Sequence, residues 1–170
     1  QYKDIPWLRL GYPTCGWGDL RGDKLKKTIQ SYHSKGIRIL LTVCQPDSSK
    51  LLDTGLVNDA AQGNPDAVQC GNEQMKQDAA VSFLYVAPDK FAKFYDLCER
   101  AVHSVRSDTP VLLGSLDPHV AGPDYQLMVN QANYLDQMQN AMNTSVHPGG
   151  NWDWHNQTLG VIDSWHNGYL

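Results

Sequence analysis

Short apolar runs alternate along this chain with longer segments in which apolar residues recur at helical spacing. The short runs end in polar residues, Gly or Pro and predict buried strands, which cover residues 5–12, 37–44, 67–71, 111–115 and 159–165. Continuous apolar runs are typical of strands that are covered on both faces, as in parallel sheets. The pattern therefore predicts an α/β domain with about five parallel strands joined by right-handed crossovers.

The segments between the strands predict helices where their apolar residues fall on one face. These helices cover residues 24–35, 89–106 and 125–142. Asp23 is the predicted N-cap of the first helix, Gly36 ends it, and Pro88 opens the second. Residues 47–66 are polar and interrupted by Ser, Gly, Asn and Pro, which predicts a loop. That loop has room for a short helix at residues 49–52, or for extra strands.

The composition restricts the number of domains and the classes of partner, but it does not indicate a function. A chain of 170 residues fits one domain, residues 1–170, and 41% hydrophobic residues suffice for a core. The net charge of -4, with both signs interspersed, argues against nucleic acid or an anionic membrane surface as a partner. No apolar run approaches the length of a membrane span. Since Gln1 is not an initiator Met, we expect a processed, trimmed or excised chain, and the missing leader says nothing about export.

The cysteines and histidines do not form a metal or redox motif. No two cysteines are close enough in sequence for a zinc knuckle or a redox pair, so buried free thiols are expected, with one disulfide as the alternative. The histidines His147, His155 and His166 are scattered. No phosphate-binding Gly-rich turn follows the first strand, which argues against a nucleotide. We therefore expect no metal and no cofactor. The cysteines are Cys15, Cys44, Cys70 and Cys98.

Polar and aromatic residues recur where the predicted strands end. Asn72 and Glu73 follow the third apolar run, and in parallel α/β folds the chemistry lies at that end of the strands. A helix cap is the plain alternative for these two residues. Convergence from several strand ends favours part of a (β/α)8 barrel, with an open doubly wound sheet as the alternative. The other strand-end residues are Tyr12, Trp17, Gln45, Asp117, His119, Trp165, His166 and Tyr169.

These residues resemble the clan of retaining glycoside hydrolases built on a (β/α)8 barrel, over about strands two to six of that barrel. Asn72-Glu73 stands where the clan has Asn-Glu at the end of its fourth strand, which implies that Glu73 is the acid/base and that Asn72 binds the sugar 2-hydroxyl. Residues 7–10 resemble the second strand, whose Arg, here Arg9, lies under the catalytic carboxylates. Residues 162–169 resemble the sixth strand, where a His and a Tyr face the substrate.

The chain departs from the clan at three points. Gln74 stands where the clan usually has Pro, and the spacing from His166 to Tyr169 is one residue longer. The clan's nucleophile is a Glu on the seventh strand, and the chain ends at the sixth. Glu99, the only other glutamate, falls in a predicted helix outside the sheet. Retaining hydrolysis uses two carboxyl groups about 5 Å apart, so the isolated chain is expected to be inactive.

The resulting prediction is a glycoside hydrolase-like domain that acts on or binds an oligo- or polysaccharide, with Glu73 as general acid/base. A non-catalytic carbohydrate-binding or structural remnant of a barrel enzyme is the alternative, and a third reading pairs Glu73 with Asp117. The tryptophans Trp152 and Trp154 could also offer apolar faces to sugar rings. The substrate-binding residues predicted are Arg9, Trp17, Asn72, His119, Trp165, His166 and Tyr169.

An open set of five strands leaves two edges, because a barrel closes only with matched strand number, tilt and stagger. The strands at residues 7–12 and 159–165 would be those edges, and both carry few charges. We therefore expect self-association or complementation by the missing barrel strands. An extracellular location follows from the family resemblance.

Overall fold

The computed structural model describes residues 6–47, 50–76, 84–115 and 125–160. Within these residues the chain forms a parallel sheet whose strands follow the order of the sequence, which confirms the predicted α/β class. A doubly wound sheet reverses its strand order at a switch point, whereas consecutive units of a (β/α)8 barrel do not. The observed order is therefore that of a barrel segment. The strands are β1 (Trp7–Gly11), β2 (Arg38–Val43), β3 (Ala67–Asn72) and β4 (Val111–Ser115).

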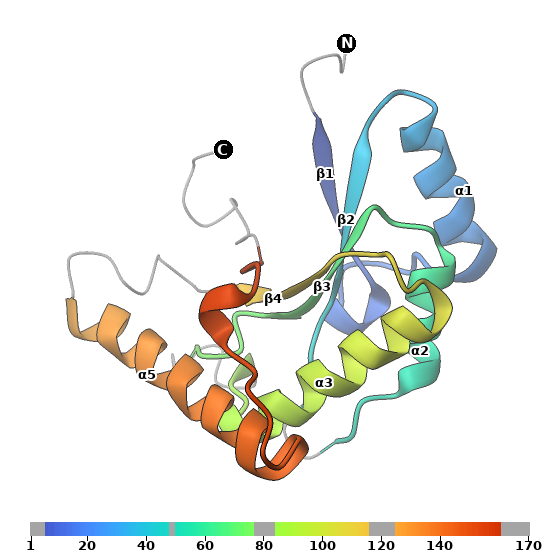
Figure 1. Cartoon of the computed structure of the whole chain (residues 1–170). Helices are drawn as coiled ribbons and strands as arrows, with labels where there is room; N and C mark the ends of the chain where they lie inside the picture. The colour runs from blue at the N-terminus through green and yellow to red at the C-terminus, as the bar shows by residue number, and fades with distance from the viewer. Residues whose placement is uncertain (1–5, 48–49, 77–83, 116–124, 161–170) are drawn as a thin grey trace.

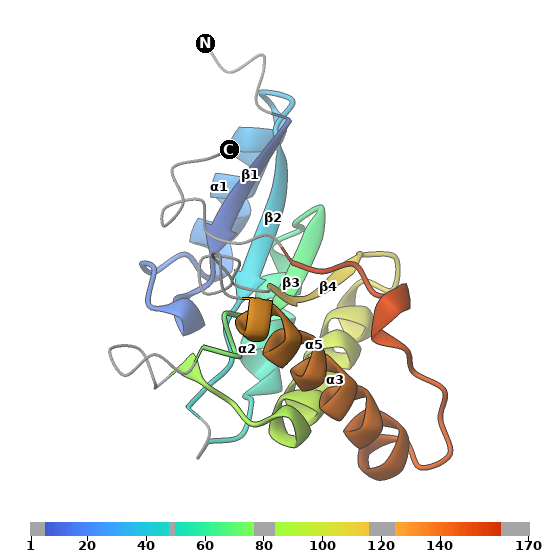
Figure 2. The ribbon, with the colours of Figure 1, turned by 90° about the vertical axis from the view of Figure 1, so that its left-hand side faces the viewer.

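The helices that connect the strands lie along one face of the sheet, as Figures 1 and 2 show. They share one apolar core with the sheet: Leu25 and Ile29 from α1 and Val57 from α2 are fully buried with Ile39 and Leu41 of β2. No helix among the described residues is long and apolar enough to cross a bilayer. The helices are α1 (Gly22–His33), α2 (Thr54–Gln62), α3 (Pro88–Val105) and α5 (Tyr125–Ala141), with short turns η1 (Pro13–Cys15), η3 (Met142–Val146) and η4 (Trp154–Asn156).

A further parallel segment extends the sheet beyond β4. Leu159 forms a parallel bridge with Leu113, whose amide donates to the Thr158 carbonyl at 2.9 Å. The Gly160 amide donates back to the Leu113 carbonyl at 2.6 Å. The predicted last strand therefore begins where expected, next to β4 and in sequence order, and its residues 161–165 lie outside the described part of the chain.

Two local predictions were wrong. Residues 54–62 form helix α2 instead of a loop, with the Asp53 carboxylate accepting from the Gly55 amide at 2.9 Å as its N-cap. Its buried residues are Val57 and two alanines, so the sequence shows no obvious apolar stripe. Packing against α3 stabilises the helix. Helix α1 begins earlier than predicted, with Arg21 at the N-cap. Asp23 instead occupies the first turn, where a carboxylate interacts favourably with the helix dipole.

The expectation of free thiols was also wrong, because all four cysteines are paired. Cys15 bonds to Cys44, which joins η1 to the residue after β2, and Cys70 of β3 bonds to Cys98 of α3. Partners 29 and 28 residues apart leave no signature in the sequence. Each pair forms because the fold places its two elements against each other: η1 against β2, and α3 against β3.

The disulfide between β3 and α3 is expected to contribute about 2–4 kcal/mol to stability, mainly by restricting the unfolded chain. The Cys70→Ala/Cys98→Ala double variant should therefore unfold at a lower denaturant concentration than the native protein in guanidinium titrations. Adding reductant to the native protein should shift its transition in the same direction. An unchanged midpoint in the double variant would contradict the structural role assigned to this bond.

Candidate active site

Side chains from four adjacent strands meet at the carboxyl-terminal end of the sheet. Arg9 on β1 reaches across β2, and its Nη2 donates to Asn72 Oδ1 of β3 at 2.7 Å. The Arg9 Nε donates to the Thr42 hydroxyl of β2 at 2.9 Å. From β4, the Ser115 hydroxyl donates to the same Asn72 oxygen at 3.3 Å. Thr42, Asn72 and Ser115 are buried, so these hydrogen bonds replace contacts with water and fix the Asn72 side chain.

The backbone of Asn72 is held by a second amide. The Gln45 Nε2 donates to the Asn72 carbonyl at 2.9 Å, and the Asn72 amide donates to Gln45 Oε1 at 2.9 Å. The Gln45 Nε2 also donates to the Leu84 carbonyl at 3.0 Å. Gln45 is buried and therefore joins the ends of β2 and β3 to the segment before α3. This reciprocal pair positions Asn72, and with it the next residue, Glu73.

Glu73 adopts a left-handed backbone conformation with a φ of 49°. A residue with a side chain adopts this conformation at a cost of about 1–3 kcal/mol, so the surrounding structure must impose it. The Glu73 side chain is 7% exposed, and its Oε2 lies 3.8 Å from the Nζ of Lys76, which is 10% exposed. The turn after β3 thus places a nearly buried carboxylate beside a cation at the carboxyl-terminal end of the sheet.

Gln74, the residue after Glu73, anchors this turn to β4. Its side chain is fully buried, and its Nε2 donates to the Gly114 carbonyl at 3.3 Å. Its Oε1 makes no hydrogen bond to the described residues. A Cβ at Gly114 would collide with the Gln74 amide, and a Cβ at Gly71, which has a φ of 99°, would collide with the Phe91 ring. The two glycines therefore leave the space that the Phe91 ring and the Gln74 amide occupy.

Trp17 lies beside Arg9, with the Arg9 guanidinium carbon 5.1 Å from the centre of a Trp17 ring. The indole also covers Gly11, where a Cβ would collide with the ring. Trp17 remains 42% exposed. Trp17 thus packs against Arg9 and Gly11 of β1 and keeps part of its ring in contact with solvent.

The structure brings together four of the eight predicted site residues, Arg9, Trp17, Asn72 and Glu73, at one end of the sheet. His119, Trp165, His166 and Tyr169 lie outside the described residues, as does Asp117. Thr42 and Ser115 also belong to the site, although no sequence motif marks them and they were not predicted. The one signal in the sequence is that each is a polar residue near the end of an apolar run.

Two other expected sugar contacts lie elsewhere. Trp152 packs against Tyr95 of α3 with ring centres 6.1 Å apart, and its backbone is held by Asn143. The Trp154 indole Nε1 donates to Asp136 of α5 at 2.9 Å. Both tryptophans therefore attach the segment after η3 to the helices and are not at the strand ends.

Glu99 lies in the helix layer, as predicted. Burial raises the pKa of this half-buried carboxyl, with nearby Asp96 adding to the effect, while His103, the Tyr95 hydroxyl and His147 act against it. The neighbouring Asp96 is buried and pairs with Arg100 at 2.6 Å and with His147 at 2.7 Å. Among the described residues no group of three or more His, Cys, Asp or Glu side chains could hold a metal ion.

No family model and no curated protein matches the chain. A glucosidase from Croceicoccus marinus aligns with 72% of this chain and 34% of its own, at 13% identity and a TM-score of 0.39. The GH53 catalytic domain of Ignisphaera aggregans aligns with 85% of this chain and 54% of its own, at 16% identity and a TM-score of 0.39. The chain thus spans about a third and about half of these two structures, and likeness at this level does not assign a family.

The contact between Arg9 and Asn72 can be tested by a double-mutant cycle on stability. Arg9→Met and Asn72→Ala should each lower the free energy of unfolding by about 1–3 kcal/mol, because each removes a hydrogen bond of the charged guanidinium to a buried acceptor. The double variant should lose less than the sum of the two, with a coupling energy of about 1–2 kcal/mol.

Arg38→Met is the matched control for this cycle. Arg38 lies at the opposite end of β2, over the ring of Trp7 at 5.3 Å. Its coupling to Asn72→Ala should be close to zero. Equal coupling for Arg9 and Arg38 would show that the contact does not exist in solution.

The raised pKa of Glu99 predicts a pH-dependent effect of Glu99→Gln. At about pH 3.5 the wild-type carboxyl is protonated in both the folded and the unfolded chain, and Gln resembles that form. As the pH rises through the raised folded value, ionisation costs more in the folded protein, so wild-type stability falls relative to the variant. The melting temperature of Glu99→Gln minus that of wild type should be larger at about pH 7.5 than at about pH 3.5. A difference that is equal at both pH values would contradict this environment.

Proposed function

We propose that this chain is a carbohydrate-active domain of the glycoside hydrolase type, with Glu73 as general acid/base and Asn72 as the ligand of a sugar hydroxyl. The observation that carries the proposal is the hydrogen bond from Arg9 to Asn72, residues 63 positions apart, directly beside Glu73. The resemblance to retaining glycoside hydrolases implied this juxtaposition from the sequence. The strand order of a barrel segment supports it independently.

In this function each group has a defined task. The protonated Glu73 carboxyl would donate its proton to the glycosidic oxygen as the bond to the sugar breaks, and the carboxylate would then accept a proton from an attacking water. The Asn72 amide would hold a ring hydroxyl while Arg9 and Ser115 keep its oxygen occupied, leaving its Nδ2 to face the sugar. The exposed ring of Trp17 would pack against the apolar face of the sugar.

Retaining hydrolysis also requires a nucleophile, and the second glutamate of the chain does not supply it. Glu99 lies on α3, which covers the outer face of the sheet and is bonded to β3 through Cys98. We propose that the 170 residues alone bind carbohydrate but do not cleave it. Further strands, whatever their source, would pair with β1, whose Trp7 is 42% exposed.

One observation favours the alternative, a carbohydrate-binding or structural remnant without catalysis. The Glu73 carboxylate is 7% exposed and paired with Lys76, an arrangement that also suits a purely structural ion pair. In either case the two disulfides favour an oxidising compartment, in keeping with an extracellular location.

The proposal predicts binding of oligosaccharides at the carboxyl-terminal end of the sheet. On a glycan array, the Trp17→Ala variant should lose affinity for the glycans that bind wild type by about three- to tenfold, because a stacking face is removed. Trp7→Ala is the matched control, since Trp7 is also 42% exposed but lies at the other end of β1. Equal losses in both variants, or no glycan bound by wild type, would contradict the proposal.

Activity of the isolated chain tests the expectation that these residues alone do not cleave glycosides. Activated aryl glycosides should be turned over by wild type no faster than by Glu73→Gln, because loss of one member of a catalytic pair removes several orders of magnitude of rate. Turnover by wild type that disappears in Glu73→Gln would overturn the expectation of inactivity. It would also show that the chain holds a second catalytic carboxylate.

A further inference from the structure

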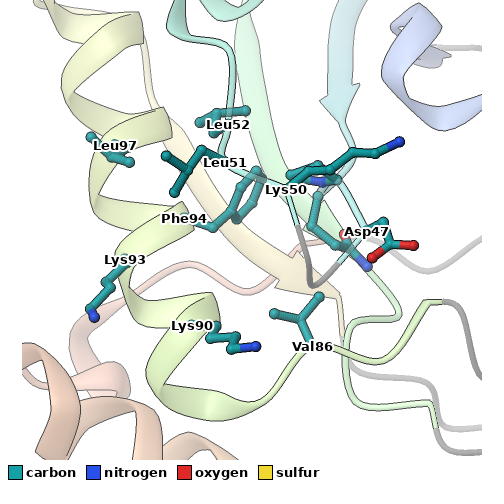
Figure 3. Close-up of a pocket in the computed structure, with 11 residues that line it drawn as sticks. Asp47, Lys50, Leu51, Leu52, Val86, Lys90, Lys93, Phe94 and Leu97 are labelled. Atoms are coloured by element: carbon teal, nitrogen blue, oxygen red, sulfur yellow. The ribbon is translucent and has the colours of Figure 1, made fainter.

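A pocket of about 220 Å³ opens between the segment that follows β2 and the first half of α3. Figure 3 shows Phe94 at its centre, with Leu51 and Leu52 on the side of the connecting segment and Leu97 on the side of α3. Val86 and Phe94 are buried and form its base. The pocket is thus lined by the elements that connect β2 and β3 to their helices, outside the sheet.

The apolar character of this pocket extends to the surface. Leu51 is 91% exposed, although it lies directly beside the apolar base of the pocket. An exposed leucine alone is ordinary, but here it continues a concave apolar surface formed by Leu52, Phe94 and Leu97. A ligand with a hydrocarbon portion would remove this surface from water, which favours binding.

The rim of the pocket is cationic. Lys50, Lys90 and Lys93 line it, against the single carboxylate of Asp47. The whole chain carries a net charge of -4, so the local charge at this pocket is opposite in sign to the net charge of the protein. Figure 3 shows Lys90 and Lys93 on α3, and Lys50 on the opposite side of the pocket. The Lys50 and Lys93 side chains are drawn with their ends away from Phe94, but both are exposed and long enough to turn towards a ligand. Lysines beside an apolar concavity are complementary to an anionic group attached to an apolar chain.

We propose that this pocket binds a small amphiphilic anion, with an alkyl chain against Phe94 and Leu51 and a carboxylate at the lysine rim. The site is separate from the candidate active site, because Arg9, Asn72 and Glu73 do not line it. The two sites adjoin through Gln45, which lines the pocket and also holds the backbone of Asn72. A bound anion would therefore contact a residue that positions the site.

Octanoate is a suitable probe, measured by isothermal titration calorimetry on the full chain. It should bind with one-to-one stoichiometry, and octylammonium, which has the same tail and the opposite charge, should not. Lys93→Gln should weaken octanoate binding by about two- to fivefold, the range of an exposed ion pair. Leu51→Ser should weaken it by about threefold or more through lost apolar contact. Neither change affects a buried residue, so both variants should fold.

Two matched controls separate this site from general effects. Lys26→Gln removes an equal charge from the exposed surface of α1, and Val105→Ser removes an exposed apolar side chain from the far end of α3. Both should bind octanoate as wild type does. The proposal is overturned if wild type does not bind octanoate, if octylammonium binds equally well, or if the control variants lose as much affinity as Lys93→Gln and Leu51→Ser.

Discussion

The hydrogen bond from Arg9 to Asn72 links the outermost strand β1 to β3 across β2 and determines much of the geometry at this end of the sheet. Arg9 is partly buried between apolar neighbours, and a charge that loses contact with water requires acceptors from the protein. Thr42 and Asn72 supply those acceptors, and both lie at the carboxyl-terminal ends of their strands. In the strand register Arg9 lies opposite Leu40, which lies opposite Ala67, so the long Arg9 side chain must extend towards the carboxyl-terminal end to reach Thr42 and Asn72. The same contacts orient Asn72.

The strained backbone at Glu73 depends on this support. Gly71 with its positive φ, the reciprocal amide pair of Gln45 and Asn72, and the buried amide of Gln74 surround the turn on several sides. The Cys70–Cys98 disulfide attaches the strand to α3 two residues before Asn72. These contacts together hold the backbone of the turn that carries Asn72 and Glu73.

Elements with long apolar patterns could be predicted from the sequence, and features that depend on contacts could not. The runs at 37–44 and 111–115 and the helix at 89–106 match β2, β4 and α3 closely, because a strong pattern and its packing agree. Helix α2 was missed since small residues such as Ala60 and Ala61 pack it without an obvious stripe. The disulfides and the roles of Thr42 and Ser115 arise only when distant strands become neighbours.

Under the proposed function, Asn72, held by Arg9, belongs to a carbohydrate site at the strand ends. Side-chain amide NMR signals report on it directly, because the amides of Asn72 and Asn143 are both hydrogen-bonded but lie in different parts of the fold. On titration with an oligosaccharide that binds the chain, the account predicts shifts of the Asn72 and Gln45 amide signals and an unchanged Asn143 signal. Shifts confined to Asn143 and the segment around Trp152 would place the carbohydrate on the helix layer and contradict the account.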